Sequence, residues 1–221
     1  MRAPLTRSQS GFTLVEIAIV LVIIGLLLGG VLKGAELIEN SKVRKATSEL
    51  NGTAAAYYSY QDRYGRIPGD DGPVATLTAR GTSWASVGAG NNNGALAVAL
   101  NQTWNGGGEN QEFWQQLKAA GFITGNPADT GVAAMPRNAF GGLLGITTAA
   151  MGNGLNGVKV CLSQVPGKGA VTLDTQLDDG LGTTGKIRAT LGASGVNTNP
   201  TNAALAAPYN EDNFYTLCMQ I

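Results

Sequence analysis

The strongest hydrophobic pattern of the chain lies near its amino terminus. Residues 12–32 read FTLVEIAIVLVIIGLLLGGVL and contain a single charged side chain, Glu16. About 20 consecutive apolar residues allow an α-helix to cross the hydrocarbon core of a bilayer. A cleaved secretory signal has a shorter apolar stretch followed by a small-residue cleavage site, and this pattern does not fit it. The sequence therefore predicts a membrane-spanning helix.

The helical pattern continues beyond the predicted span. Proline does not occur between Leu5 and Ile67, and apolar residues recur every three or four positions at Val43, Ala46, Leu50, Ala54, Tyr57 and Tyr60. We therefore expect one helix from Phe12 to about Asp62, which at 1.5 Å per residue would be about 75 Å long. Charged residues occupy the remaining positions of its second half and are expected to form a solvated face.

The rest of the chain has the pattern of a loop-rich head with short strands. After residues 64–72 the composition changes to Gly, Asn, Thr and Ala, and an amphipathic segment from Glu109 to Gly121 predicts a second helix. Short strand candidates follow at residues 158–162, 170–173, 186–191 and 214–219. The expected fold is α+β, in which the second half of the long helix packs on a small antiparallel sheet.

Composition and charge exclude several classes of function. Charged residues make up 14% of the chain, whereas soluble domains typically contain about 25%. The 15 basic residues equal the 15 acidic residues, so binding of nucleic acid through bulk charge is not expected. The chain has no His and two Cys, which excludes His-dependent catalysis and a zinc site of four thiolates. No catalytic residue and no cofactor are predicted.

The residues at the head of the span carry a resemblance to a known family. The run Gly11-Phe12-Thr13-Leu14-Val15-Glu16, followed by the apolar stretch, resembles the processing motif of type IV prepilins and of the related pseudopilins of type II secretion. This resemblance implies that residues 1–11 are a leader and that a prepilin peptidase cuts between Gly11 and Phe12 on the cytoplasmic side. The same enzyme would then methylate the new amine of Phe12.

Glu16 allows two interpretations. It could lie at the membrane interface and be hydrated, or it could pair with a positive group on another chain. We favour pairing, because an ionisable residue within a span is a functional hypothesis by default. The resemblance implies that the partner is the Phe12 amine of a neighbouring subunit, which assigns Glu16 to filament assembly.

The resemblance also implies an organisation and a set of partners. It divides the chain into the leader 1–11, the membrane and filament-core half-helix 12–33, the amphipathic half-helix 34–64 and the β-rich head 65–221. The expected partners are copies of the chain or related pilins in a helical filament, the prepilin peptidase, the inner-membrane assembly platform and the membrane itself. The expected location is the inner membrane, with a single pass and the head outside the cytoplasm, and then a surface or periplasmic filament.

Three functions compete at this stage. The first is a structural subunit of a type IV pilus-like filament that serves adhesion, motility or DNA uptake. The second is a pseudopilin that drives protein export by a type II secretion system. The third is a membrane-anchored enzyme or receptor, and the absence of His and of any convergent polar set argues against it. We favour the first.

The two cysteines, Cys161 and Cys218, either are buried free thiols or form a disulfide. The predicted export favours the disulfide, and the resemblance agrees, because many type IV pilins close their carboxyl-terminal region with one disulfide.

The densest acidic cluster contains Asp174, Asp178 and Asp179, in a segment expected to form a turn. These carboxylates are weak candidates for a calcium site. We expect a solvated β-turn without a metal, because Asp179 stands where the calcium loop of helical hands needs glycine.

Overall fold

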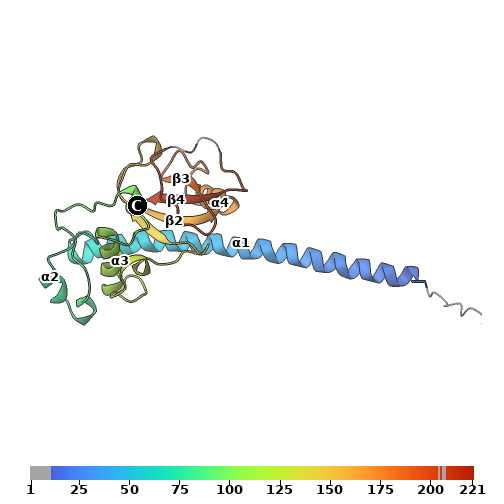
Figure 1. The fold of residues 1–221 in the computed structure, drawn as a ribbon, viewed down its shortest axis with the longest axis horizontal. Helices are drawn as coiled ribbons and strands as arrows, with labels where there is room; N and C mark the ends of the chain where they lie inside the picture. The colour runs from blue at the N-terminus through green and yellow to red at the C-terminus, as the bar shows by residue number, and fades with distance from the viewer. Residues whose placement is uncertain (1–10, 204, 206–207) are drawn as a thin grey trace, which may run out of the picture. The chain divides into compact units, whose positions relative to one another are not determined.

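The computed structural model describes residues 11–203, 205 and 208–221 of the chain (Figure 1). The predicted leader lies outside the described residues except for Gly11. The chain divides into two compact units, Met1–Ser41 and Lys42–Ile221. The α-helices are α1 (Leu14–Tyr64), α2 (Val74–Thr78), α3 (Glu109–Ala119) and α4 (Gly167–Leu177). The strands are β1 (Leu144–Thr147), β2 (Lys159–Pro166), β3 (Ile187–Gly192) and β4 (Phe214–Gln220), and four short 3₁₀ turns lie at Thr82–Trp84, Leu100–Gln102, Gly131–Ala134 and Gly152–Gly154.

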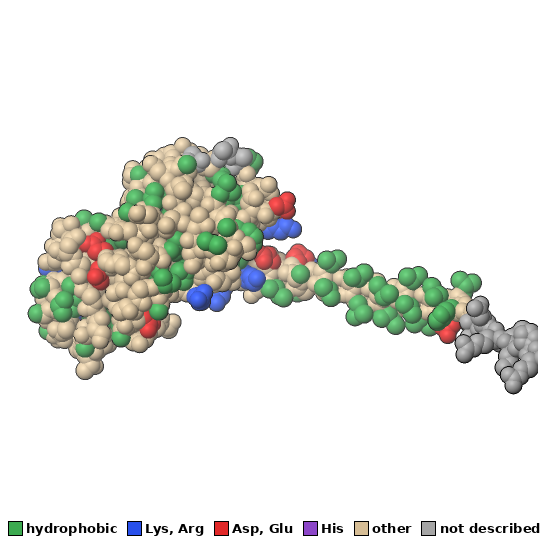
Figure 2. All heavy atoms as spheres, viewed as in Figure 1, with side chains coloured by type: hydrophobic (Ala, Val, Ile, Leu, Met, Phe, Trp, Pro, Cys, Tyr) green, Lys and Arg blue, Asp and Glu red, His purple; other side chains and the backbone are tan. Residues whose placement is uncertain are grey.

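The first half of α1 exposes nearly all of its apolar surface. Its large hydrophobic side chains from Phe12 to Leu32 are between 46% and 90% exposed. The most apolar part of the helix is long enough to cross a membrane, and none of it is buried among the described residues. Figure 2 shows hydrophobic side chains along the length of this part of the helix. The described residues do not cover this surface, and apolar surface of this kind is stabilised when lipid or other apolar groups remove it from water.

The second half of α1 contributes one face to the core of the unit Lys42–Ile221. Val43, Ala46, Leu50, Tyr57 and Tyr60 are all buried there, which confirms the predicted apolar stripe, although Ala54 is only half-buried. Their spacing of three, four, seven and three residues keeps them on one side of a helix with 3.6 residues per turn. They belong to the same hydrophobic cluster as the inner side chains of the sheet.

The four strands form one antiparallel sheet in the order β1-β2-β4-β3. The central strands β2 and β4 are paired directly, and Cys161 of β2 lies opposite Cys218 of β4 in the register. A β-bulge interrupts this pairing between Leu162 and Val165. Together with the long helix, the sheet makes the fold α+β, as predicted.

The sequence interpretation was wrong for residues 170–173, which were expected to form a strand. They belong to α4, which follows directly after Pro166 and contacts β2 and β4. The buried residues Ala170, Leu173 and Asp174 are spaced by three and four positions, as on one face of a helix. The β-branched residues of this short window favoured a strand locally, and packing on the sheet decided otherwise.

Strand β1 was not predicted. Its residues stand in a glycine-rich stretch that reads as a loop, and β1 has only four residues. Gly145 is required there, because a Cβ at this position would lie 2.5 Å from the carbonyl oxygen of Thr103 and from the ring of Trp104. Strand β1 therefore depends on close packing of its backbone against Thr103 and Trp104, which are distant in the sequence.

Buried polar side chains hold the junction that follows α1. The helix ends at Tyr64, and Gly65 adopts a φ of +62°. The carboxylate of Asp70 then accepts hydrogen bonds from the backbone N–H groups of Asn93 (3.2 Å) and Gly94 (2.7 Å). The side chain of Gln116 on α3 accepts a bond from the N–H of Gly69 (2.7 Å). These bonds attach the junction both to α3 and to the 88–97 loop.

Glu112, on α3 beside this junction, has an unusual pKa. Burial, together with the smaller effect of the neighbouring Glu109 charge, raises the pKa of its carboxyl to about 7. The backbone of Gly88 packs against this side chain, since a Cβ on Gly88 would lie 2.7 Å from the Cγ of Glu112. Between pH 4.5 and about 7, Glu112 is therefore mostly protonated in the folded chain and mostly ionised in the unfolded chain.

We expect Glu112→Gln to increase stability above pH 7 but not at pH 4.5. Because the pKa of Glu112 is higher in the folded chain, its contribution is fully present below pH 4.5 and is lost as the pH rises through 7. A neutral Gln avoids this loss, so the free energy of unfolding should exceed that of the wild type by on the order of 1 to 3 kcal/mol at pH 8. Urea unfolding of the full chain in detergent measures this difference.

Glu211→Gln, which removes an exposed carboxylate, is the control. An equal difference between Glu112→Gln and the wild type at pH 4.5 and pH 8 would contradict the expected pH dependence.

Candidate functional site

The start of α1 is closed by a reciprocal pair of side chains, Thr13 and Glu16. The carboxylate Oε2 of Glu16 accepts hydrogen bonds from the backbone N–H of Thr13 (2.8 Å) and from its hydroxyl (2.8 Å). The hydroxyl Oγ1 of Thr13 in turn accepts a bond from the backbone N–H of Glu16 (3.2 Å). This arrangement is a capping box, which satisfies two backbone donors that a helix start otherwise leaves free.

The capping box was missed at the level of the sequence, although its signal was present. Thr13 and Glu16 are three positions apart just before a long apolar run, which is the Thr-x-x-Glu pattern of a helix start. Glu16 therefore has a local partner in Thr13, and the second oxygen of its carboxylate makes no hydrogen bond within the described residues.

The predicted cleavage bond, between Gly11 and Phe12, lies just outside the helix. Both residues have no regular secondary structure and are exposed, and the Phe12 side chain is 84% exposed. A backbone outside a helix can enter the active site of a peptidase without unwinding, whereas helical peptide bonds are engaged in the i to i−4 hydrogen-bond pattern. The structure thus places the bond two residues ahead of the capping box.

The comparisons with known proteins agree with this part of the chain. Residues 6–32 match the family model of the prokaryotic N-terminal methylation motif. No curated protein and no solved structure matches the chain. The matched motif is the signature of type IV pilins and pseudopilins. This match over residues 6–32 supports a type IV pilin-like or pseudopilin protein, and together with the apolar helix it fits a membrane anchor.

The two cysteines form a disulfide in the structure, as predicted. Cys161 and Cys218 are joined within the sheet, with a sequence separation of 57 residues. Both are fully buried, and the bond connects the central strands β2 and β4 where they are already paired. It therefore fastens the last strand of the chain to the rest of the sheet.

The acidic cluster differs from the solvated β-turn that was predicted. Asp174 is a buried residue of α4, whereas Asp178 caps the end of this helix and Asp179 follows it. The structure brings carboxylate oxygens of all three within 4.8 Å of one another. Burial raises the pKa of Asp174, and hydrogen bonds from Tyr209 and Gly180 oppose that shift.

Each carboxylate of the cluster already accepts hydrogen bonds from the protein. Asp174 accepts bonds from the Tyr209 hydroxyl (2.5 Å) and the Gly180 N–H (3.2 Å). Asp178 accepts bonds from the N–H groups of Lys186 (2.5 Å) and Ile187 (2.8 Å). Through these bonds the cluster fastens the loop after α4 to the start of β3. These bonds give Asp174 and Asp178 a structural role, and the absence of a metal stays a prediction.

We expect calcium to leave the stability of the protein unchanged apart from an ionic-strength effect. A tightly held ion would stabilise the fold by about 2.7 kcal/mol at a hundredfold excess over its dissociation constant. Thermal unfolding of the full chain in detergent, with calcium and with a chelator, measures this difference. A calcium-specific rise of several degrees that disappears in an Asp178→Asn, Asp179→Asn double variant would contradict the expectation.

Proposed function

We propose that the protein is a structural subunit of a type IV pilus-like filament. In this proposal, a prepilin peptidase removes residues 1–11 and methylates the amine of Phe12. The subunit then waits in the inner membrane with its head outside the cytoplasm. Assembly extracts it from the bilayer and transfers its apolar half-helix into the core of the filament.

One observation supports this proposal above the others: the matched motif extends into an apolar helix surface that the described residues leave uncovered. The motif covers residues 6–32, and no part of the span is buried within the described residues. In a bilayer, lipid covers this surface. Outside the bilayer, only other apolar surfaces can do so, and identical helices from neighbouring copies provide them.

In this proposal, the position of Glu16 determines how neighbouring copies align with one another in the filament. A carboxylate near the middle of a bilayer costs about 2.5 to 3.5 kcal/mol, and less near the edge. Cleavage after Gly11 would create a positive amine at Phe12, four residues from Glu16. When that amine meets the Glu16 carboxylate of a neighbouring copy, two isolated charges in an apolar environment become one pair. Removing one partner would leave the other charge without compensation.

We expect the mature protein to begin at methylated Phe12. The Gly11–Phe12 bond is exposed and precedes the helix, so the peptidase can reach it in the full chain. Mass spectrometry of the protein from its native host should detect an amino-terminal peptide that starts with N-methyl phenylalanine. An intact Met1 terminus in cells with an active prepilin peptidase would contradict the proposed processing.

We expect Glu16→Gln to abolish filaments while the subunit remains in the membrane. Gln at this position can still close the capping box, because its side-chain oxygen accepts the same bonds, but it has no charge to pair with the Phe12 amine. Thr13→Val is the matched control, since it removes the hydroxyl of the capping box and keeps the carboxylate of Glu16. Electron microscopy of sheared surface material gives the filament count.

The two variants separate charge pairing from helix capping. Filaments from Thr13→Val but not from Glu16→Gln support the pairing. Normal numbers of filaments from Glu16→Gln, expressed as the sole subunit, would show that the pairing is not needed.

A further inference from the structure

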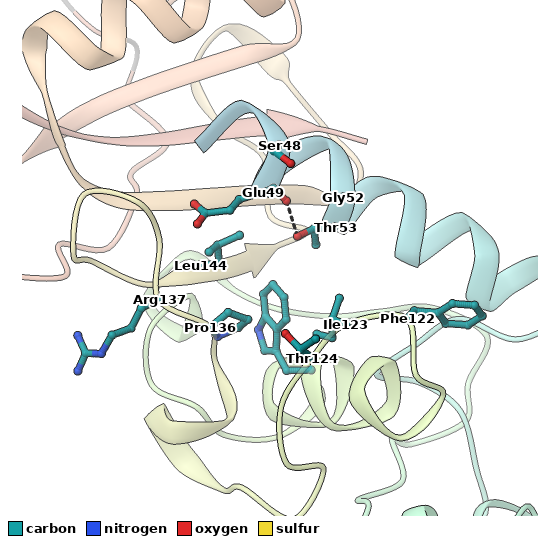
Figure 3. Close-up of a pocket in the computed structure, with 11 residues that line it drawn as sticks. Ser48, Glu49, Gly52, Thr53, Phe122, Ile123, Thr124, Pro136, Arg137 and Leu144 are labelled. Atoms are coloured by element: carbon teal, nitrogen blue, oxygen red, sulfur yellow. Dashed lines mark hydrogen bonds between the residues drawn. The ribbon is translucent and has the colours of Figure 1, made fainter. Parts of the chain in front are cut away.

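A groove with a volume of about 410 Å³ opens on the surface of the unit Lys42–Ile221. One wall is α1 from Ser48 to Thr53, and the other walls come from the segment after α3, from residues 136 and 137, and from β1 (Figure 3). Most of its lining is apolar and includes Trp114, Phe122, Ile123, Pro136 and Leu144. Such a groove, built from several elements around one helix, has the character of a binding surface.

Gly52 lines this groove and, having no side chain, leaves room in it. It lies in the interior of α1, where glycine destabilises a helix by about 0.8 to 1 kcal/mol relative to alanine. No neighbouring atom requires a glycine here, because a Cβ at this position would meet nothing within 4 Å. Packing inside a single copy of the chain therefore does not explain the residue. A side chain at position 52 would instead project into the groove and reduce the room for an occupant.

The rim of the groove carries one free positive charge. Glu49, on α1, is already engaged, because its carboxylate accepts a bond from the N–H of Ala139 (2.9 Å) and lies 3.7 Å from the Lys45 ammonium. Arg137 is exposed, and in Figure 3 its guanidinium extends away from the groove. Within the described residues Arg137 makes one hydrogen bond, to the carbonyl oxygen of Gly141 (3.3 Å), and no ion pair. The rim therefore suits an apolar segment with an acidic flank.

The segment around Leu37 and Ile38 combines exposed apolar side chains with acidic neighbours. Leu37 and Ile38 of α1 are both 60% exposed and lie beyond the predicted span, so lipid does not cover them. They are flanked by Glu36 and Glu39, which gives the sequence Glu-Leu-Ile-Glu. Glu36 pairs with Lys33 at 2.8 Å, whereas Glu39 has no ion pair within the described residues. Glu39 is half-buried, and its Oε1 is buried without a hydrogen-bond partner within the described residues, so its carboxylate can approach a basic rim only through Oε2.

We propose that the groove at Gly52 binds the Leu37–Ile38 segment of a second copy of the chain, with Glu39 of that copy beside Arg137. Ile38 and Gly52 belong to one helix, so a copy cannot place its own Ile38 on its own Gly52. The contact is therefore heterologous, since two different surfaces of the same chain meet. Heterologous contacts that do not close into a ring generate helical filaments. This inference rests on the proposed function and adds a second contact beyond the Glu16 pairing.

The test is disulfide crosslinking between copies of the full chain in its native host. Ile38→Cys combined with Thr124→Cys places one thiol on the segment and the other at the exposed edge of the groove. We expect covalent multimers in filaments and in membranes under mild oxidation, which disappear on reduction. Ile38→Cys combined with Leu191→Cys is the matched control, because Leu191 is 59% exposed on β3, at the opposite edge of the sheet from β1. A non-reducing digest checks that Cys161 and Cys218 remain paired.

A second variant fills the groove without adding a thiol. Gly52→Phe should reduce the number of filaments at least tenfold while the membrane content of the subunit stays normal, because the new side chain meets open space in the single copy. Asn51→Phe is the control: it adds the same ring at the adjacent exposed position, which does not line the groove, and should leave filament numbers unchanged.

The outcomes separate this inference from the proposed function. Wild-type filaments together with no Ile38–Thr124 crosslink, or with an equal crosslink in the Leu191 control, would overturn the docking proposal and leave the pilin function intact. Normal filaments from Gly52→Phe would overturn it as well. If the wild type forms no filaments, the proposed function fails, and the crosslink in membranes still decides whether the segment occupies the groove.

Discussion

The rest of the protein depends on an apolar helix surface that the described residues leave uncovered. From Phe12 to Leu32 every large hydrophobic side chain is at least 46% exposed. Exposure of this extent in water would cost about 25 cal/mol for each Å² of apolar area, so the surface always needs a bilayer or other copies around it. The matched motif, residues 6–32, extends into this helix, and the head begins where the same helix acquires a buried stripe.

Glu16 has a role within its own chain besides the assembly role that we propose for it. In the single chain it closes the helix start with Thr13, which satisfies backbone donors that a helix otherwise leaves free. One carboxylate oxygen carries both bonds from Thr13, and the other is available to a cation. A carboxylate that is already oriented by its own helix is better prepared for pairing than a freely rotating one, because less conformational entropy is lost when the partner arrives.

The head is held together by polar contacts as much as by its hydrophobic cluster. Carboxylates of Asp70, Asp174 and Asp178 accept bonds from backbone N–H groups of loops that lack regular structure. The disulfide between Cys161 and Cys218 links β4 to β2, the two central strands of the sheet. Long glycine-rich loops bury little apolar area, so side-chain to backbone bonds provide much of what positions them.

The local sequence was sufficient wherever one pattern was long and uninterrupted. The apolar run, the stripe through Val43 and Leu50, and the amphipathic helix α3 follow from periodicity, and the motif at Gly11 and Phe12 follows from residue identity. The Thr13–Glu16 capping box could have been predicted in the same way. These features depend on neighbours within a few positions, which a sequence displays directly.

Only the tertiary structure decided the features that depend on distant partners. The segment at Ala170 and Leu173 became a helix because its buried face packs on β2 and β4, and β1 formed because Gly145 allows close contact with Thr103 and Trp104. The burial of Asp174 and the groove around Gly52 likewise arise from residues far apart in the chain. Short segments satisfy helix and strand preferences almost equally, and burial against the rest of the fold is the larger free-energy term.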